Sequence, residues 1–207
     1  MIHLSEAEQD ALQELFNIGM GRAAAALERL LGNEICLSVP FLTMLSASKA
    51  ATLIQAPAHK DVSSVRQSFS GPFSGTAILI FPEENSVDLI RTLIDNSFPL
   101  ETLGELEQDS LLEIGNIVLN ACLGSFANLM QKEIEFNLPT FIKGKCEQLL
   151  SFNNSQTDEP LIFLVINFNS SEGADVGKSI KGFVVLLLDA SGSANLKQEL
   201  QLLLEAQ

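Results

Sequence analysis

The stretch Asp10-Ala-Leu-Gln-Glu14-Leu-Phe-Asn17 occurs a second time in this chain, as Asp109-Ser-Leu-Leu-Glu113-Ile-Gly-Asn116. A proline follows each asparagine after the same gap, so one offset of 99 residues relates positions 10, 14, 17 and 40 to 109, 113, 116 and 139. Self-similarity at a fixed offset indicates an internal repeat. Because the unit is much longer than a solenoid repeat, we expect two copies to form one duplicated domain with approximate two-fold symmetry.

Each copy predicts a long helix that carries a narrow polar stripe. Steps of four, three and four residues return to nearly the same angle on an α-helix. The first stripe therefore holds Asp10, Glu14, Asn17 and Gly21, and the second holds Asp109, Glu113, Asn116 and Asn120. The apolar residues of the first helix lie on roughly the opposite side, as packing on a core requires: Leu12, Leu15, Phe16, Ala23, Leu27 and Leu30. We expect both stripes to face water or a partner.

The order of the predicted elements favours an α+β fold. A capping box formed by Ser5 and Glu8 opens a helix over about 5–31, which Gly32-Asn33 ends. Strands at 34–40, 65–70 and 75–81 and a helix over about 82–96 follow, with a turn at Gly71-Pro72. The second half predicts a helix over about 105–131, strands at 134–139, 161–169 and 180–188, and a helix over 191–205.

A helix, three strands and a helix thus occur twice, in two repeats of about 1–98 and 99–207. We predict a single domain over 1–207 with a mainly antiparallel sheet flanked by helices, pseudo-two-fold symmetry and two long site-bearing helices. Segment 46–61 gives no clear pattern. Segment 98–103 is predicted to connect the halves, and 151–160 and 170–178 are predicted to be exposed loops.

Composition and charge exclude several classes of protein. The net charge of −14 argues against nucleic-acid binding and against docking on anionic lipid. No secretory signal opens the chain, and apolar runs such as 161–166 are too short to span a bilayer, so we expect a cytoplasmic protein. The spacing of Cys36, Cys122 and Cys146 favours reduced core thiols. Only two histidines are present, far apart in sequence, and they suggest no metal site.

The repeated residue types limit the chemistry that the stripes can perform. Two carboxylates at i, i+4 on an exposed face lack the burial that would separate their pKa values for acid–base catalysis, and no cluster completes a nucleophilic triad. An asparagine is no useful base, but it can hold a water molecule in line with an electrophile, as an amide does in some phosphoryl-transfer sites. A glutamate one turn away can pair with a cation on the same partner.

The glycines of the two helices need a separate explanation. The run from Gly19 to Ala24 matches a loose dinucleotide-binding fingerprint, but that fingerprint requires a preceding strand, and here a helical pattern precedes it. Glycine inside a helix costs about 1 kcal/mol relative to alanine. We therefore expect close approach of the other long helix, or of a partner's backbone, at Gly19, Gly21, Gly115 and Gly124.

The pattern of Asp or Ser, Glu four residues later, Asn three residues after that and Pro after a further gap resembles the CheC/CheX/FliY family of bacterial chemotaxis phosphatases. Both halves fit the pattern, and the resemblance covers essentially the whole chain. FliY-like members carry further segments for which this chain has no room, so it resembles a free-standing CheC-like or CheX-like member. Phe16 in place of Gly115, and Arg22 after Gly21, depart from the pattern in the first copy.

The resemblance implies an enzyme that hydrolyses the aspartyl phosphate of a CheY-type response regulator. Asn17 and Asn116 would orient the attacking water, and Glu14 and Glu113 would pair with the receiver's active-site lysine. Asp10 and Asp109, with Pro40 and Pro139, would be supporting motif positions, and the prolines would constrain the chain direction. The Mg²⁺ belongs to the receiver, so no cofactor of the chain's own is expected. In the first copy, the bulky Phe16 would either hinder the receiver's approach or face the core. We therefore expect the second copy, with Glu113 and Asn116, to be the more competent site.

Two alternatives to the phosphatase stay open. One is a non-catalytic binding module for a phosphorylated receiver or another chemotaxis signalling protein, and the other is a purely structural relative of flagellar switch domains. The resemblance also makes the deamidase CheD a candidate partner, although no residues mark a surface for it. A homodimer, the identity of the receiver and the pathway, chemotaxis or another two-component circuit, are left open by the sequence.

Overall fold

One seven-stranded antiparallel sheet forms the centre of the molecule. The structure is a computed structural model, and it describes residues 4–32, 34–54, 61–71, 74–94, 103–150, 160–170 and 179–205. The first half of the chain contributes α1 (Glu6–Leu31), β1 (Ile35–Leu45), α2 (Ala47–Ile54), β2 (Val62–Ser70), β3 (Gly75–Pro82) and α3 (Glu83–Ile94). The second half contributes α4 (Leu103–Leu129), β4 (Glu135–Phe136), β5 (Thr140–Gly144), α5 (Cys146–Leu150), β6 (Leu161–Ser170), β7 (Ser179–Leu188) and α6 (Ala190–Glu205).

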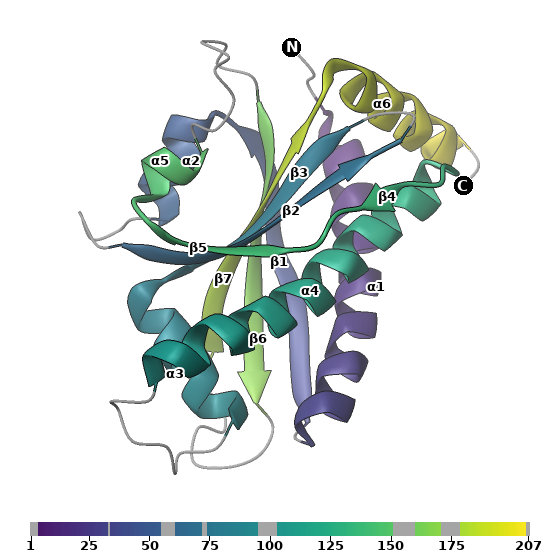
Figure 1. Cartoon of the computed structure of the whole chain (residues 1–207). Coiled ribbons are helices and arrows are strands. Elements are labelled where there is room, and N and C mark those ends of the chain that lie inside the picture. The colour runs from purple at the N-terminus through teal and green to yellow at the C-terminus, as the bar shows by residue number, and fades with distance from the viewer. Residues whose placement is uncertain are drawn as a thin grey trace.

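The strands of the two halves are interleaved in this sheet. The order is β1-β6-β7-β3-β2-β4, and β5 also pairs with β2 (Figure 1). The first strand of each half therefore pairs with a strand of the other half: β1 lies against β6, and β4 and β5 lie against β2. At the centre, β3 of the first half pairs with β7 of the second. The mixed, mainly antiparallel fold predicted from the sequence is confirmed.

Helices cover both faces of the sheet and bury an apolar core on each. The larger core joins one face of the sheet to α1, α4, α3 and α6, and α1 and α4 pack against each other. Figure 1 shows these two long helices crossing on the same side of the sheet. The smaller core lies on the opposite face, where α2 and α5 cover side chains such as Ile80, Phe163 and Val185.

Strand β1 contains a β-bulge at Pro40. Its partner register moves from Ser38 opposite Asn167 to Phe41 opposite Val165, so β1 has one extra residue over this interval. Before the bulge, Leu37 and Val39 face the larger core, and after it Leu42 does. Without the extra residue, period-2 alternation would turn Leu42 away from that core. Pro40 fits this position because a bulged residue needs no ladder donor.

Several predicted boundaries differ from those of the structure. Strand β1 continues to Leu45 instead of ending at Pro40, because the bulge accommodates the proline. Of the strand predicted at 134–139, only β4 at 135–136 forms, and β5 begins after the predicted range, at Thr140. The short helices α2 and α5 were not predicted, so each half has one more helix than the expected helix–three strands–helix unit. The predicted segments at 98–102, 151–159 and 171–178 lie outside the described residues.

Helix α4 is long and apolar enough, by length and composition alone, to cross a membrane, and in the described part of the chain it is the one helix that meets this test. Half of its apolar window, within Glu107–Leu129, is buried inside the molecule. The buried apolar residues of α4 include Val118, Leu119, Cys122 and Leu123, which belong to the larger core. The same composition is typical of a helix that packs on a sheet.

Candidate functional site

The two polar stripes lie on the outer sides of α1 and α4, as the spacing predicted. Asp10, Glu14 and Gly21 are exposed on α1, and Asp109 and Glu113 are exposed on α4. Asn17, Asn116 and Asn120 are half-buried. Most of the predicted apolar side of α1 is buried, including Leu12, Phe16, Ala23 and Leu27, but Leu30 is 51% exposed and does not belong to the core.

In the first stripe, the Asn17 amide binds the backbone of the β1 bulge. Val39 N–H donates to Asn17 Oδ1 at 2.8 Å, and Asn17 Nδ2 donates to the Val39 carbonyl at 3.5 Å. Gln13 Nε2 donates to the same carbonyl at 3.0 Å. The bulge takes Val39 out of the regular strand register, which makes its backbone groups available to the helix. Thus Asn17 fastens α1 to the strand immediately before Pro40.

In the second stripe, the Asn116 amide contacts another amide instead of the backbone. Asn120 Nδ2 donates to Asn116 Oδ1 at 2.9 Å. Gln67 Nε2, from β2, donates to Asn120 Oδ1 at 3.0 Å and to the Asn137 carbonyl at 3.1 Å. The strand position that precedes Pro139 is Leu138, which is 88% exposed, whereas its counterpart Val39 is 1% exposed. The two stripes therefore share residue types, but their asparagines differ in hydrogen bonding.

Residues 16 and 115, the main sequence difference between the two motifs, both face inward. Phe16 is fully buried, so it does not stand beside the exposed stripe. Gly115 packs against β2, and a Cβ added there would come within 2.5 Å of Val65 Cγ1. The expected close approach of the other long helix is present at Gly19, where an added Cβ would lie 2.6 Å from Ser125 Oγ on α4, whereas the close neighbour of Gly115 is a strand. At Gly21 and Gly124 an added Cβ meets open space, so the expectation is wrong for these two glycines.

A buried carboxylate anchors the first part of α4 to the neighbouring elements. Ser63 Oγ of β2 and Ser86 Oγ of α3 each donate to Glu107 Oε1 at 2.8 Å. Lys143 Nζ of β5 lies 3.4 Å from Glu107 Oε2 and 3.2 Å from Glu83 Oε1. Partial burial opposes the charge of Lys143, but the bonds and charges of Glu83 and Glu107 prevail and raise its pKa. This network joins the first part of α4 to three elements, β2, α3 and β5, and positions the stripe that follows.

The groups at the stripes suit hydrogen bonding and ion pairing rather than covalent or metal chemistry. Within the described ranges no cluster of His, Cys, Asp and Glu could hold a metal ion. Burial raises the pKa of the Cys122 thiol to about 12, and burial followed by the charge of Glu147 raises that of Cys146 to about 12, so neither is an activated nucleophile. Cys36 is exposed, contrary to the predicted core position. Each stripe offers a carboxylate and an amide one turn apart.

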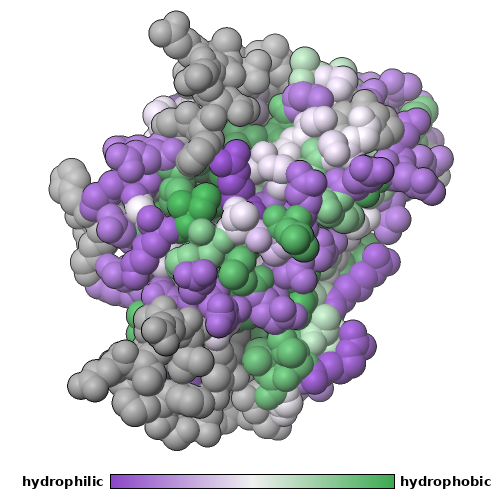
Figure 2. Space-filling model, in the orientation of Figure 1, coloured by the Kyte–Doolittle hydropathy of each residue, from purple (hydrophilic) through white to green (hydrophobic). Residues whose placement is uncertain are grey.

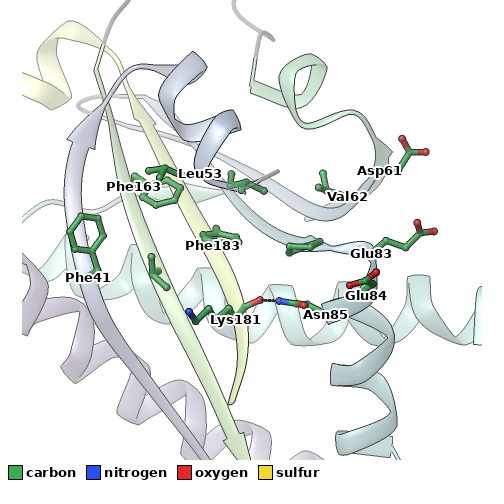
Figure 3. A pocket seen from close by; sticks show the side chains of 13 residues that line it. Phe41, Leu53, Asp61, Val62, Glu83, Glu84, Asn85, Phe163, Lys181 and Phe183 are labelled. Carbon is green, nitrogen blue, oxygen red and sulfur yellow. Dashed lines mark hydrogen bonds between the residues drawn. The ribbon is translucent and has the colours of Figure 1, made fainter. Parts of the chain in front are cut away.

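A separate pocket of about 430 Å³ lies away from both stripes (Figure 3). Its apolar wall includes Phe41, Phe163 and Phe183, and its charged groups include Glu83 and Lys181. Figure 3 shows these side chains on the sheet strands and at the start of α3, with the Asn85 amide donating to the Lys181 carbonyl. None of the predicted site residues lines it.

Comparison with known proteins shows which family shares these residues. The family model described as the CheC-like family matches residues 8–44, which include the first stripe and Pro40. The chain is 32% identical over 139 residues to the CheY-P phosphatase CheC of Bacillus subtilis, a match that covers 66% of each protein. This chain belongs to the CheC/CheX/FliY family. The resemblance found in the sequence is thereby confirmed.

Other members of the CheC/CheX/FliY family match over more of the chain. The flagellar motor switch phosphatase FliY of B. subtilis is 24% identical over 179 residues, which cover 86% of this chain and 46% of that protein. The chain thus spans from about half to about two thirds of the length of these two relatives. The crystal structure of Thermotoga maritima FliY superimposes with a TM-score of 0.72 at 17% identity, covering 97% of this chain and 98% of that one. That similarity shows the shared fold.

Sequence reasoning did not find Gln67, Val39 and Asn137 as partners of the site asparagines. Gln67 carried no distinctive signal in the sequence, because β2 is rich in polar residues, and only the structure shows that this side chain is 2% exposed. Its partners, however, lie on α4 and beside β4, and no spacing along the chain relates them.

Proposed function

We propose that this protein is a cytoplasmic phosphatase that hydrolyses the aspartyl phosphate of a CheY-type response regulator. The observation that carries the proposal is the geometry of the two stripes: an outward carboxylate stands one turn from a half-buried amide whose oxygen is already held by the protein. A half-buried amide with limited freedom can hold a water molecule, and an exposed carboxylate can reach a cation on a partner.

The proposed roles follow from what each group can donate or accept. Asn116 keeps one Oδ1 lone pair for a water proton and the Nδ2 hydrogens for a phosphoryl oxygen. Glu113, exposed one turn earlier, would pair with the receiver's lysine. Mg²⁺ would arrive with the phosphorylated receiver, as part of the substrate. Positioning of the water is the main contribution to rate, and misplacing it costs on the order of 100-fold.

We propose that the second stripe is the principal site. Phe16 gives no steric reason for this ranking, because it is buried. The reason is the hydrogen bonding: Asn17 has both its oxygen and its nitrogen near the Val39 backbone, whereas Asn116 is bonded through its oxygen alone among the residues that the structure describes. Glu14 and Asn17 would then contribute less to turnover.

We also propose that residues 1–207 form one domain that arose from two copies, about 1–98 and 99–207. The pairings support this, since β1, which follows the long helix of the first half, pairs with β6 of the second, and β5, which with β4 follows the long helix of the second half, pairs with β2 of the first. Both pairings are antiparallel, so they have the same sense, as equivalent halves require.

The test is the decay of phosphoryl label from a purified CheY-type receiver, measured with catalytic amounts of wild type, Asn17→Ala, Asn116→Ala and the double variant. We expect wild type to accelerate decay, Asn116→Ala to lose about 10- to 100-fold of the acceleration, and Asn17→Ala to lose less. Equal losses would contradict the ranking of the sites. Phosphate-dependent binding without any acceleration by folded wild type would replace the phosphatase by the binding-module alternative.

A further inference from the structure

Three side-chain amides connect the interior of the sheet to Asn116. Gln67 lies on β2, where it is 2% exposed, and it donates to Asn120 Oδ1 at 3.0 Å. Asn120 in turn donates to Asn116 Oδ1 at 2.9 Å. A buried strand residue is thereby linked, through one intermediate, to the half-buried amide of the stripe. Gln67, Asn120 and Asn116 are called the amide relay below.

The direction of every bond in the amide relay follows from one backbone group. The Asn137 carbonyl can only accept, so Gln67 must turn Nε2 toward it, at 3.1 Å. The same Nε2 then faces Asn120, which must present Oδ1 as the acceptor. Asn120 is left with Nδ2 toward Asn116, and Asn116 must answer with Oδ1. The orientation of the Asn116 amide is therefore fixed by a carbonyl that it does not touch.

Glutamine at position 67 costs stability, and this cost indicates that its side chain serves to orient the neighbouring amides. Gln67 Oε1 is buried and has no hydrogen-bond partner within the described part of the chain. A buried carbonyl oxygen without a partner is unfavourable, and an apolar side chain of similar size would avoid the penalty. What glutamine provides, and an apolar residue could not, is a donor aimed at both the Asn137 carbonyl and Asn120.

The first stripe reaches the same amide orientation by another route. Val39 N–H can only donate, so Asn17 must present Oδ1 to it, and the distance is 2.8 Å. In both stripes the oxygen of the site asparagine is thus held by a donor of the protein. Two unrelated arrangements, a bulged strand and an amide relay, give the asparagine the same polarity.

We propose that Gln67 and Asn120 are positioning residues that set the polarity of the Asn116 amide, so that its nitrogen faces the phosphoryl group and its remaining oxygen lone pair faces the water. The inference rests on the proposed phosphatase function. Without the amide relay, the amide of Asn116 can rotate by half a turn, which exchanges donor and acceptor at the reacting atoms.

The decisive variant is Asn120→Asp, which keeps the size of the side chain but replaces its hydrogen-bond donor by a second acceptor. Aspartate still accepts from Gln67, but it cannot donate to Asn116, which must then turn Nδ2 toward the carboxylate. We expect kcat to fall about 10- to 100-fold in Asn120→Asp. Asn120→Ala leaves the amide free to adopt either orientation, so we expect a smaller fall, about 2- to 10-fold. Gln67→Leu, which leaves Asn120 without its fixed donor, should fall in the same smaller range.

A matched charge control separates orientation from electrostatic repulsion of the receiver. Asn128→Asp adds one carboxylate to an exposed position two turns further along the same helix. We expect wild-type kcat in this variant. A charge effect on receiver encounter would raise KM and diminish with salt, whereas a reversed amide lowers kcat independently of salt.

A second readout does not depend on activity. The side-chain NH₂ resonances of Asn116, identified by their loss in Asn116→Ala, should shift in Asn120→Asp as the group begins to donate to a carboxylate. If wild type accelerates receiver decay and Asn116→Ala abolishes it while Asn120→Asp keeps wild-type kcat, the positioning role is overturned. An unshifted Asn116 resonance in Asn120→Asp also overturns it. If wild type shows no acceleration, the proposed function fails, and the resonance still decides whether the amide relay orients Asn116.

Discussion

Gly19 of α1 and Ser125 of α4 lie in direct contact where the two site-bearing helices pack against each other. A Cβ at position 19 would lie 2.6 Å from Ser125 Oγ and 3.0 Å from the Ala121 carbonyl oxygen. The hydroxyl is a side-chain group that can move, but the carbonyl belongs to the helix backbone. The absence of a side chain at Gly19 therefore sets the distance between the helices that carry the two stripes.

We predict that Gly19→Ala lowers the free energy of unfolding by about 1 kcal/mol, because overpacking of about 1–3 kcal/mol exceeds the gain in helix propensity of about 1 kcal/mol. Gly21→Ala is the matched control on the same helix, where an added Cβ meets open space. It should stabilise the protein by up to about 1 kcal/mol. Urea denaturation of the two variants checks the pair, and a shift of the same sign in both would contradict the helix contact.

The two site asparagines should differ in their effect on stability. Asn17→Ala removes the acceptor of the Val39 N–H, whose residue is 1% exposed, so we expect a loss of about 1–3 kcal/mol. Asn116→Ala removes a bond between two half-buried amides, and water can replace it, so we expect a loss below about 1 kcal/mol. Thermal unfolding compares the variants. A larger loss for Asn116→Ala would refute the assignment of Asn17 to the more structural role.

Leu138 is expected to contribute to receiver binding, provided the proposed function holds. It is 88% exposed, and it follows Asn137, whose carbonyl accepts from the amide relay. On the face drawn in Figure 2, exposed hydrophobic residues form separate patches. Leu138→Ser should raise KM for the phosphorylated receiver by about 3- to 10-fold and leave kcat unchanged. Leu202→Ser on α6, at a residue that is 51% exposed, is the control. Similar KM values for both variants would place the receiver elsewhere.

The start of α1 should make stability dependent on pH in the acid range. Ser5 N–H donates to Glu8 Oε2 at 2.7 Å, and this backbone hydrogen bond is the largest cause that lowers the pKa of the Glu8 carboxyl. A lowered folded-state pKa means a contribution to stability that is present above the unfolded-state value and is lost as the pH falls through the folded-state value.

Glu8→Gln should therefore reduce the loss of stability between about pH 5 and pH 3, because glutamine keeps an acceptor for Ser5 and removes the titrating charge. Denaturation midpoints across this range provide the measurement. Glu6→Gln changes an exposed side chain in the same helical turn and leaves the Ser5–Glu8 bonds in place. If the two variants flatten the pH dependence equally, the capping box is not its source.

Local signals were enough to predict the long elements and the placement of the stripes. The Ser5–Glu8 capping box and Gly32, which has a φ of 74°, fix both ends of α1 as predicted. Strands β2 and β3 flank the predicted turn, where Gly71 has a positive φ. The helical period alone placed Glu14 and Glu113 on exposed surfaces. These features depend on residues close together in the chain, which is why a pattern along the sequence reveals them.

The features that the sequence did not predict depend on contacts between distant residues. Pro40 reads as the end of a strand, and it becomes a bulge only because β6 continues beside it. Helices α2 and α5 are too short for a clear period, and they are stabilised by packing on the sheet and on each other. The link between Gln67 and Asn120 joins residues 53 positions apart. Each of these needs the assembled sheet before it has any meaning.

The interleaved order of the strands has a consequence for how the chain reaches its native state. Pairing β1 with β6 joins Leu45 to Leu161, and pairing β2 with β5 joins Val62 to Gly144. Each half leaves strand edges without hydrogen-bonding partners unless the other half is present. If the chain is cut between the halves, we expect neither fragment to fold alone and the native structure to form only when the two are mixed. Closure of such distant pairs is slow. During synthesis, the strands of the first half therefore stay partly unpaired until β5, β6 and β7 of the second half have been made.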